Sequence, residues 1–271
     1  MYVRPSAPLS IGGVVDDGLR LYRAAFSHTW KLSIGFSIAL AALGLAIGLA
    51  VPGIYDVRGA VPPQQVLQAF SSPVVITSYL LILLGECVFY GALFAAENAV
   101  MRGEPLSAGA AALAGFRRLP GVLLAGVVFC VAVFVGSLLL LIPGIYLWGK
   151  LQLSSAALFA EDASAMKALE SSWNLTRGRW WRTVVIITVA LIILYILALA
   201  VGMIPVYLIA FASMKSGNVF MGSVATLPFS ILTAVIVKPV MPAILLAVHH
   251  DCKLRSEGGD LAERAGALGP A

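Results

Sequence analysis

Three charged residues lie inside long apolar stretches of the sequence: Glu86, Lys150 and Lys238. Glu86 and Lys150 each precede the acidic residue that ends their stretch by eleven residues, and Lys238 precedes its own by thirteen. At about 1.5 Å per helical residue, these spacings predict that all three lie near the middle of a bilayer. A lone charge at that depth costs roughly 2.5 to 3.5 kcal/mol. We therefore expect Glu86 to face Lys150, Lys238 or both inside a helix bundle.

One acid facing two bases is compatible with two kinds of chemistry. Either the charges only fix the packing of helices, or they form a binding site for a substrate or a proton. Pro239 and Pro242 follow Lys238 and are expected to break the last helix, which frees backbone carbonyl groups near the charges. Broken helices at this depth are common in transporters, so a small-solute transporter or channel is one functional hypothesis.

A second group of residues with binding chemistry lies between the fourth and fifth apolar stretches. Basic and aromatic side chains are mixed there: Trp173, Arg177, Arg179, Trp180, Trp181 and Arg182. Arginines bind phosphate groups, and tryptophan rings prefer the boundary between membrane and water. The cluster predicts a site for anionic lipid head groups, although arginines at such a position also serve to orient helices in the membrane.

Arrangements that perform catalysis are missing from the sequence. It contains no phosphate-binding glycine loop, no Ser/His/Asp arrangement and no paired-cysteine zinc motif. His249, His250, Asp251 and Cys252 are adjacent, and adjacent residues on a helix point in different directions, which disfavours a metal site. We expect no enzyme activity, no catalytic or metal-ligating residue, and no cofactor.

Membrane-spanning helices are needed to position these residues. Apolar residues make up 60% of the 271 residues and charged residues only 11%, whereas about a quarter of the residues of soluble domains are charged. Stretches of about 20 apolar residues match the hydrocarbon core of a bilayer. We predict an all-α, polytopic membrane helical bundle with about six transmembrane helices, near residues 30–51, 74–96, 122–141, 143–160, 183–212 and 227–248.

The distribution of basic residues predicts the orientation of these helices. Fourteen of the eighteen Lys and Arg residues fall on one side of the predicted membrane, and only Arg58 and Lys215 on the other. Basic loops stay in the cytoplasm, so both termini are expected there. The net charge of +5 is spread over helix ends and forms no single patch, so we expect no nucleic-acid partner.

The sequence repeats itself at an offset of 97 residues. The tripeptide Pro-Leu-Ser at residues 8–10 returns at 105–107, and Gly18 returns as Gly115. A third unit begins near Asp162. These matches predict a threefold repeat in which each unit has an amphipathic interfacial helix followed by a helical hairpin.

The chain is expected to have three parts. In residues 1–29, apolar side chains recur every three or four positions from Ile11 to Phe26, which predicts an amphipathic helix lying flat on the cytoplasmic surface. Residues 30–248 are expected to form the six-helix transmembrane domain. Residues 249–271 are rich in Gly, Ala and Glu toward their end and are expected to be a disordered cytoplasmic tail.

Several motifs resemble those of a family of bacterial membrane proteins. They are IPGIYL at residues 142–147, residues 157–162, LESSWNLTRGRWWR at residues 169–182, and the opening segment 8–26. These motifs are similar to the glycerophosphoryl diester phosphodiesterase membrane-domain family and to related six-helix inner-membrane proteins. Some relatives carry a soluble phosphodiesterase domain, which we do not expect here. The resemblance implies a membrane scaffold and transfers no activity.

We therefore expect a non-enzymatic, multi-pass protein of the bacterial plasma membrane that interacts with lipids or supports membrane organisation. The expected partners are membrane lipids with anionic head groups, and the sequence identifies no protein partner or oligomeric state. The expected binding residues are Glu86, Lys150, Lys238, Arg177, Arg179 and Arg182.

Overall fold

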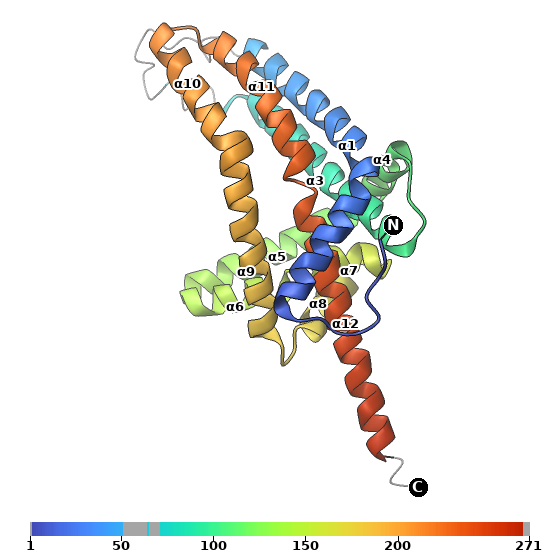
Figure 1. Cartoon of the computed structure of the whole chain (residues 1–271). Coiled ribbons are helices and arrows are strands. Elements are labelled where there is room, and N and C mark those ends of the chain that lie inside the picture. Colours follow the sequence, from blue (N-terminus) through green and yellow to red (C-terminus); the bar gives the residue numbers. More distant parts are fainter. Residues whose placement is uncertain (1, 51–63, 65–70, 268–271) are drawn as a thin grey trace.

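Every regular secondary-structure element in the described part of the chain is a helix, which confirms the predicted all-α class. The structure is a computed structural model that describes residues 2–50, 64 and 71–267. Figure 1 shows the arrangement of the helices. Their bounds are α1 Ile11–Ala50, α3 Pro73–Arg102, α4 Ala108–Arg117, α5 Leu119–Leu139, α6 Leu141–Leu151, α7 Ser154–Ala160, α8 Ala165–Leu175, α9 Trp180–Ala198, the π-helical turn η1 Leu199–Met203, α10 Ile204–Ser216, α11 Val219–Ile236 and α12 Val240–Ala267.

Five helical segments of the described chain are long and apolar enough to cross a membrane. A helix is suited to this role because it satisfies its own backbone hydrogen bonds. The chain is therefore a multi-pass membrane protein. The five segments are Ile11–Ile47, Pro73–Arg102, Leu119–Leu139, Trp180–Ser216 and Phe220–Gly258.

The fourth predicted span, residues 143–160, is built differently from the prediction. It is divided between α6, with 11 residues, and α7, with 7 residues. Gln152 and Leu153 separate the two helices. Because about 20 helical residues are needed to cross the hydrocarbon core, neither helix spans a membrane by itself.

Two other interruptions follow from prolines. Pro205 comes directly after η1, the π-helical turn that separates α9 from α10. Pro239 lies between the last residue of α11 and the first residue of α12. A proline ring lacks the backbone N–H and clashes with the carbonyl group four residues earlier. The helical hydrogen-bond pattern is therefore interrupted at both positions, as the sequence predicts.

Helix α1 departs from the prediction for residues 1–29. The amphipathic segment and the first span form one continuous helix of 40 residues, rather than a flat surface helix and a separate span. Its first half packs against α12, and a side chain added at Gly18 would lie 2.8 Å from the Cα atom of Ile244. The buried face includes Val14 and Leu21, whereas Phe26 of the predicted stripe is exposed. Contact with α12 has replaced the predicted contact with the membrane surface.

The 97-residue repeat is visible at the starts of two helices. The Ser10 hydroxyl accepts a hydrogen bond of 3.1 Å from the backbone N–H of Gly13. Its counterpart Ser107 accepts a hydrogen bond of 3.3 Å from Ala110. Helices α1 and α4 each begin at the residue after this serine. The repeated motif therefore encodes the same N-terminal helix cap twice.

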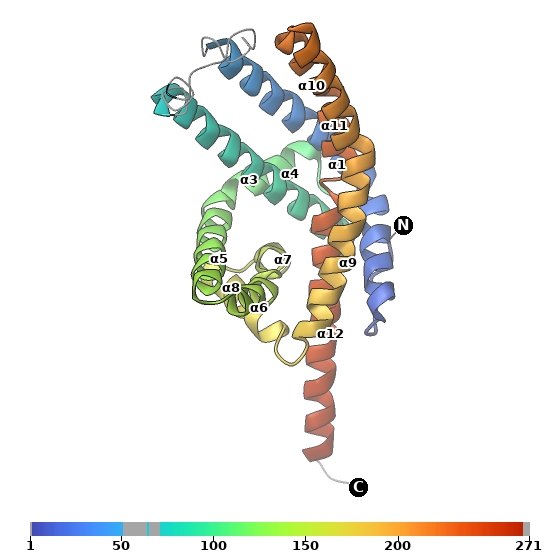
Figure 2. The ribbon, with the colours of Figure 1, turned by 90° about the vertical axis from the view of Figure 1, so that its left-hand side faces the viewer.

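The helices meet at one end of the molecule and separate toward the other, as Figures 1 and 2 show. We call the first the packed end, because it holds the larger cluster of buried apolar residues. We call the second the splayed end, and it contains the last part of α1, the first part of α3, α10 and α11. The packed end contains the first half of α1, the last part of α3, α7, α8, the start of α9 and residues 240–252 of α12.

Helix α12 continues beyond the predicted end of the membrane domain. Residues 249–267, which were expected to belong to a disordered tail, are helical. Asp251 and Cys252 are buried in the packed end. The remaining turns project away from the other helices (Figure 1).

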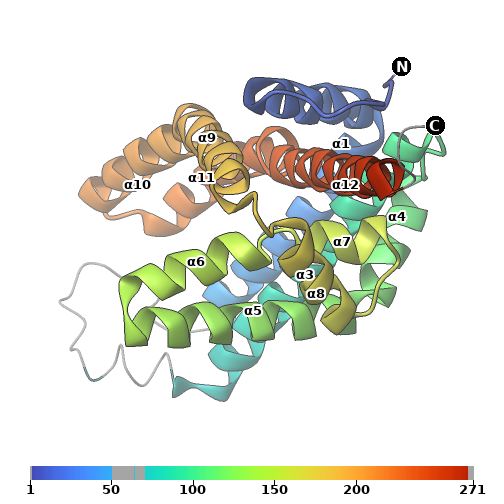
Figure 3. The ribbon, with the colours of Figure 1, turned by 90° about the horizontal axis from the view of Figure 1, so that it is seen from below.

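Helices α5 and α6 form an antiparallel hairpin that extends sideways from the packed end. Figure 3 shows the two helices side by side in the view from below, whereas α9 and α10 run upward in Figure 1. The tip of the hairpin, from Leu138 to Ile142, is 68–79% exposed. A surface this apolar requires a non-aqueous environment, because its exposure to water is unfavourable.

Candidate functional site

Glu86 and Lys238 form an ion pair, one of the arrangements that the sequence predicts. The Nζ atom of Lys238 lies 2.6 and 2.8 Å from the two carboxylate oxygens of Glu86. Lys238 lies in the break between α11 and α12, and Glu86 lies on α3. The side chains are 28% and 33% exposed, so the pair borders the surface of the bundle. The same Nζ atom lies 5.3 Å from the ring centre of Phe89, close enough for a cation–π contact.

Lys150 does not take part in this pair. Its buried Nζ atom lies 5.7 Å from the ring centre of Tyr146 and 5.2 Å from that of Trp173. It also donates a hydrogen bond of 3.4 Å to the backbone oxygen of Trp173. Two aromatic rings and a carbonyl group thus take the place of a carboxylate partner. Of the predicted partners of Glu86, the structure selects Lys238 alone.

The side chain of Ser172 on α8 bonds to the backbone on both sides of the break between α6 and α7. Its hydroxyl donates to the backbone oxygen of Lys150 at 2.7 Å and accepts from the backbone N–H of Leu153 at 3.1 Å. Buried backbone groups that lose their helical partners must find others. These bonds fix α8 against α6 and α7, and they position the aromatic and basic segment that follows α8.

The aromatic and basic residues form a groove between α6 and the start of α9, with a volume of about 890 Å³. The indole N–H of Trp180 donates to the backbone oxygen of Tyr146 at 3.0 Å. Gly149 permits this approach, because a side chain there would lie 2.6 Å from the indole nitrogen. The groove combines apolar walls with guanidinium groups. Its lining residues are Ile142, Ile145, Tyr146, Gly178, Arg179, Trp180, Trp181 and Arg182.

The three predicted arginines have different surroundings. Arg182 is tied to neighbouring segments by the network described below. Arg179 donates one hydrogen bond of 2.9 Å to the backbone oxygen of Arg255 and keeps its other donors. Arg177 is exposed, and within the described part of the chain it makes no ion pair. Arg177 and Arg179 are therefore the members of this cluster that can bind an anion.

Asp251 is the centre of a polar network at the packed end. Its carboxylate, only 4% exposed, accepts hydrogen bonds from the backbone N–H of Leu9 at 2.8 Å and from Arg182 and Arg255 at 2.9 Å each. Both arginines also donate to the backbone oxygen of Leu9, at 2.7 and 2.6 Å. The N-terminal segment is thereby joined to α9 and α12. The sequence analysis missed this role, and the available signal was the spacing of four residues between Asp251 and Arg255.

Two glutamates near corresponding hairpin ends differ in their surroundings. The Oε1 atom of Glu161 lies 3.1 Å from Nε2 of His249 and 3.7 Å from Nζ of Lys253. The hydrogen bond with His249 is the main cause that lowers the pKa of Glu161 to about 2. Glu97 is fully buried, and neither of its carboxylate oxygens has a hydrogen-bond partner among the described residues. Glu161 therefore connects its loop to α12 through His249 and Lys253, whereas the carboxylate of Glu97 makes no such connection among the described residues.

Comparison with known proteins places the chain in a family. Residues 77–249, more than half of the chain, match the family described as a domain of unknown function (DUF7847). No curated protein and no solved structure matches the chain. The matched residues run from α3 to α12 and include the Glu86–Lys238 pair, Lys150 and the groove. On the strength of this match, the chain belongs to the DUF7847 family.

Proposed function

We propose that this chain is a non-enzymatic protein of the bacterial plasma membrane that binds anionic lipids and supports membrane organisation. The observation that carries the proposal is the groove between α6 and α9. It places guanidinium groups beside exposed aromatic and aliphatic side chains, the two kinds of surface that a lipid head group and its acyl chains require.

The electrostatics of the groove favour an anionic head group. Arg177 and Arg179 have donors that the described residues do not use, and a basic residue near an anionic membrane surface contributes about 1 kcal/mol. Trp181, at 75% exposure, is free to contact the interfacial region of the bilayer. The bound lipid would therefore be held by charge at its phosphate and by aromatic contact below it.

The orientation in the membrane follows from the same residues. The proposal places the basic segment and both termini in the cytoplasm, because basic loops are retained there. The resemblance of residues 142–147 and 169–182 to the glycerophosphoryl diester phosphodiesterase membrane-domain family supports a bacterial inner-membrane scaffold. It supports no phosphodiesterase activity for this chain.

Lipid binding by variants in nanodiscs or mild detergent tests the proposal. The full-length chain is titrated with phosphatidylglycerol and with phosphatidylcholine, and retained lipid is counted by native mass spectrometry. The double variant Arg177→Gln with Arg179→Gln should bind phosphatidylglycerol about thirtyfold more weakly, because it loses two favourable charges of about 1 kcal/mol each. Binding of phosphatidylcholine should change little.

A matched control removes two exposed charges elsewhere. Arg23→Gln with Lys167→Gln lowers the net charge by the same amount without touching the groove. If both double variants lose phosphatidylglycerol equally, general surface charge explains the binding and the groove has no special role. The midpoint of thermal unfolding is followed for each variant, so that loss of folding is recognised.

The transporter hypothesis has less support. It relied on three charges at one depth, and Lys150 is paired with aromatic rings rather than with Glu86. The remaining pair, Glu86 and Lys238, is mutually satisfied. A neutralised Glu86→Gln variant that abolished uptake of a defined solute while keeping its fold would reverse this preference.

A further inference from the structure

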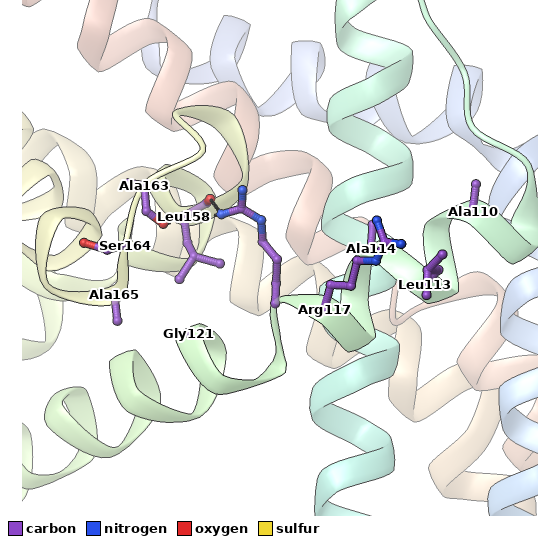
Figure 4. Close-up of a pocket in the computed structure, with 10 residues that line it drawn as sticks. Ala110, Leu113, Ala114, Arg117, Gly121, Leu158, Ala163, Ser164 and Ala165 are labelled. Atoms are coloured by element: carbon purple, nitrogen blue, oxygen red, sulfur yellow. Dashed lines mark hydrogen bonds between the residues drawn. The ribbon is translucent and has the colours of Figure 1, made fainter.

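A second binding region lies on the other side of α8, where the end of α4 and the start of α5 face the start of α8. A cavity of about 640 Å³ opens between these elements. Figure 4 shows Arg117, Leu113 and Ala114 on the α4 side and Leu158, Ala163 and Ser164 opposite them. Arg117 and Arg118 supply the positive charge of the cavity.

The two arginines have complementary roles. Arg118 donates to the backbone oxygens of Leu158 at 2.8 Å and Ala163 at 3.3 Å, and it forms an ion pair with Asp162. This arginine is therefore held in place by the loop between α7 and α8. Arg117 is exposed and has no ion-pair partner within the described ranges. Its charge is not neutralised by any neighbouring acid, so the cavity attracts anions.

An apolar cavity of about 500 Å³ lies next to the basic one along α5. The two share Leu158, and Gly121 of the basic cavity is followed directly by Val122 of the apolar cavity. The apolar cavity runs along α5 to Val131, and at 1.5 Å per residue this distance from Gly121 is about 15 Å. That length is about half of the hydrocarbon thickness of about 30 Å, so it matches the length of one acyl chain.

We propose that these two adjacent cavities together bind a single anionic glycerophospholipid. Its phosphate lies against Arg117 and Arg118, and one acyl chain lies along α5 between α3 and α7. A basic recess beside an apolar recess of acyl-chain length is complementary to this ligand at both ends. A free phosphate would leave the apolar cavity empty, and a neutral lipid would leave Arg117 unpaired. The site shares no residue with the groove between α6 and α9 and does not depend on it.

Two substitutions address the two ends of the ligand separately. Arg117→Gln removes the free charge from an exposed position. Gly126→Leu fills the apolar cavity, and the position accepts a side chain because nothing lies within 4 Å of an added Cβ atom. As controls, Arg177→Gln removes one charge from the basic segment beside the groove, and Gly109→Leu adds the same side chain at an open helical position outside both cavities.

The experiment is a titration of the full-length protein with phosphatidylglycerol, phosphatidylcholine and inorganic phosphate, followed by native mass spectrometry. The expected result is one tightly retained phosphatidylglycerol, bound about fivefold more weakly by Arg117→Gln, as the loss of about 1 kcal/mol requires, and also lost from Gly126→Leu. Gly109→Leu should retain it, and Arg177→Gln should affect only the lipid of the groove. Unchanged binding by Gly126→Leu, or equal retention of phosphatidylcholine, would overturn the proposal.

Discussion

The segment Phe220–Gly258, which joins α11 to the first part of α12, and helix α5 are both apolar enough to cross a membrane, yet the protein uses their surfaces in opposite ways. In the segment Phe220–Gly258, 61% of the residues in the most apolar 18-residue stretch are buried. In the corresponding stretch of α5, 11% of the residues are buried. Helix α12 lies in the packed end, where it contacts α1, α3, α7, α8 and α9. Helix α5 forms one arm of the α5–α6 hairpin, and most of its surface is not covered by other helices.

The difference separates two sources of stability. At the packed end, protein contacts protein, and the buried carboxylate of Asp251 accepts hydrogen bonds from Leu9, Arg182 and Arg255. At the splayed end and in the α5–α6 hairpin, apolar side chains face outward, so lipid must serve as their solvent. A change at the packed end should therefore be more costly than the same change elsewhere.

The largest effect is expected for Asp251→Asn. The substitution removes the charge that compensates two arginines, and breaking such a buried pair costs about 3 kcal/mol. The free energy of unfolding in mild detergent should fall by about this amount. Asp16→Asn is the matched control, because Asp16 forms an exposed pair with Arg20 on α1 and should lose less than about 1 kcal/mol. Equal losses would show that the packed end has no special electrostatic role.

A second comparison uses glycines. Gly115 of α4 lies so close to α3 that an added Cβ atom would be 2.5 Å from the backbone oxygen of Val88. Gly115→Ala should therefore destabilise the protein by about 2 kcal/mol through overpacking. Gly44 in the last part of α1 has nothing within 4 Å of an added Cβ atom, so Gly44→Ala should be neutral or slightly stabilising. Unfolding midpoints of both variants measure the contrast, and a larger loss at Gly44 would contradict it.

The smallest effect is expected for the ion pair beyond the packed end. Glu86 and Lys238 are each about a third exposed, so a double-mutant cycle with Glu86→Gln and Lys238→Met should give a coupling of about 1 kcal/mol. The cycle is measured by unfolding in the same detergent. A coupling of about 3 kcal/mol or more would mean that this region is held as firmly as the packed end.

Local rules predicted the elements of this fold better than their arrangement. The helical class and the break beside Pro239 depend on nearby residues, so the sequence is sufficient for them. The burial of α1 depends on Gly18 meeting α12, more than 200 residues away in the chain. Periodicity alone assigned that helix to the membrane surface, because it records which face is apolar and not which partner covers it.

The candidate site shows the same division. The sequence analysis placed Lys150 at the depth of Glu86 by assuming a straight helix from Lys150 to Glu161. The break after α6 lies between these two residues, so the assumption does not hold. Residues 150–160 contain no proline or glycine that would predict this break, and Gly149, the glycine just before them, lies within α6. Arg182 was expected to bind lipid, and instead it donates to Asp251, because the folding of the N-terminal segment brings Leu9 to both.

The hydroxyl of Ser172 also has a consequence for the synthesis of the protein. The ribosome releases the break between α6 and α7 about twenty residues before it releases the serine that closes this break. During that interval the backbone groups of Lys150 and Leu153 lack their final partners, and water or the insertion machinery must supply them. The break between α6 and α7 can therefore acquire its final hydrogen bonds only after α8 has emerged.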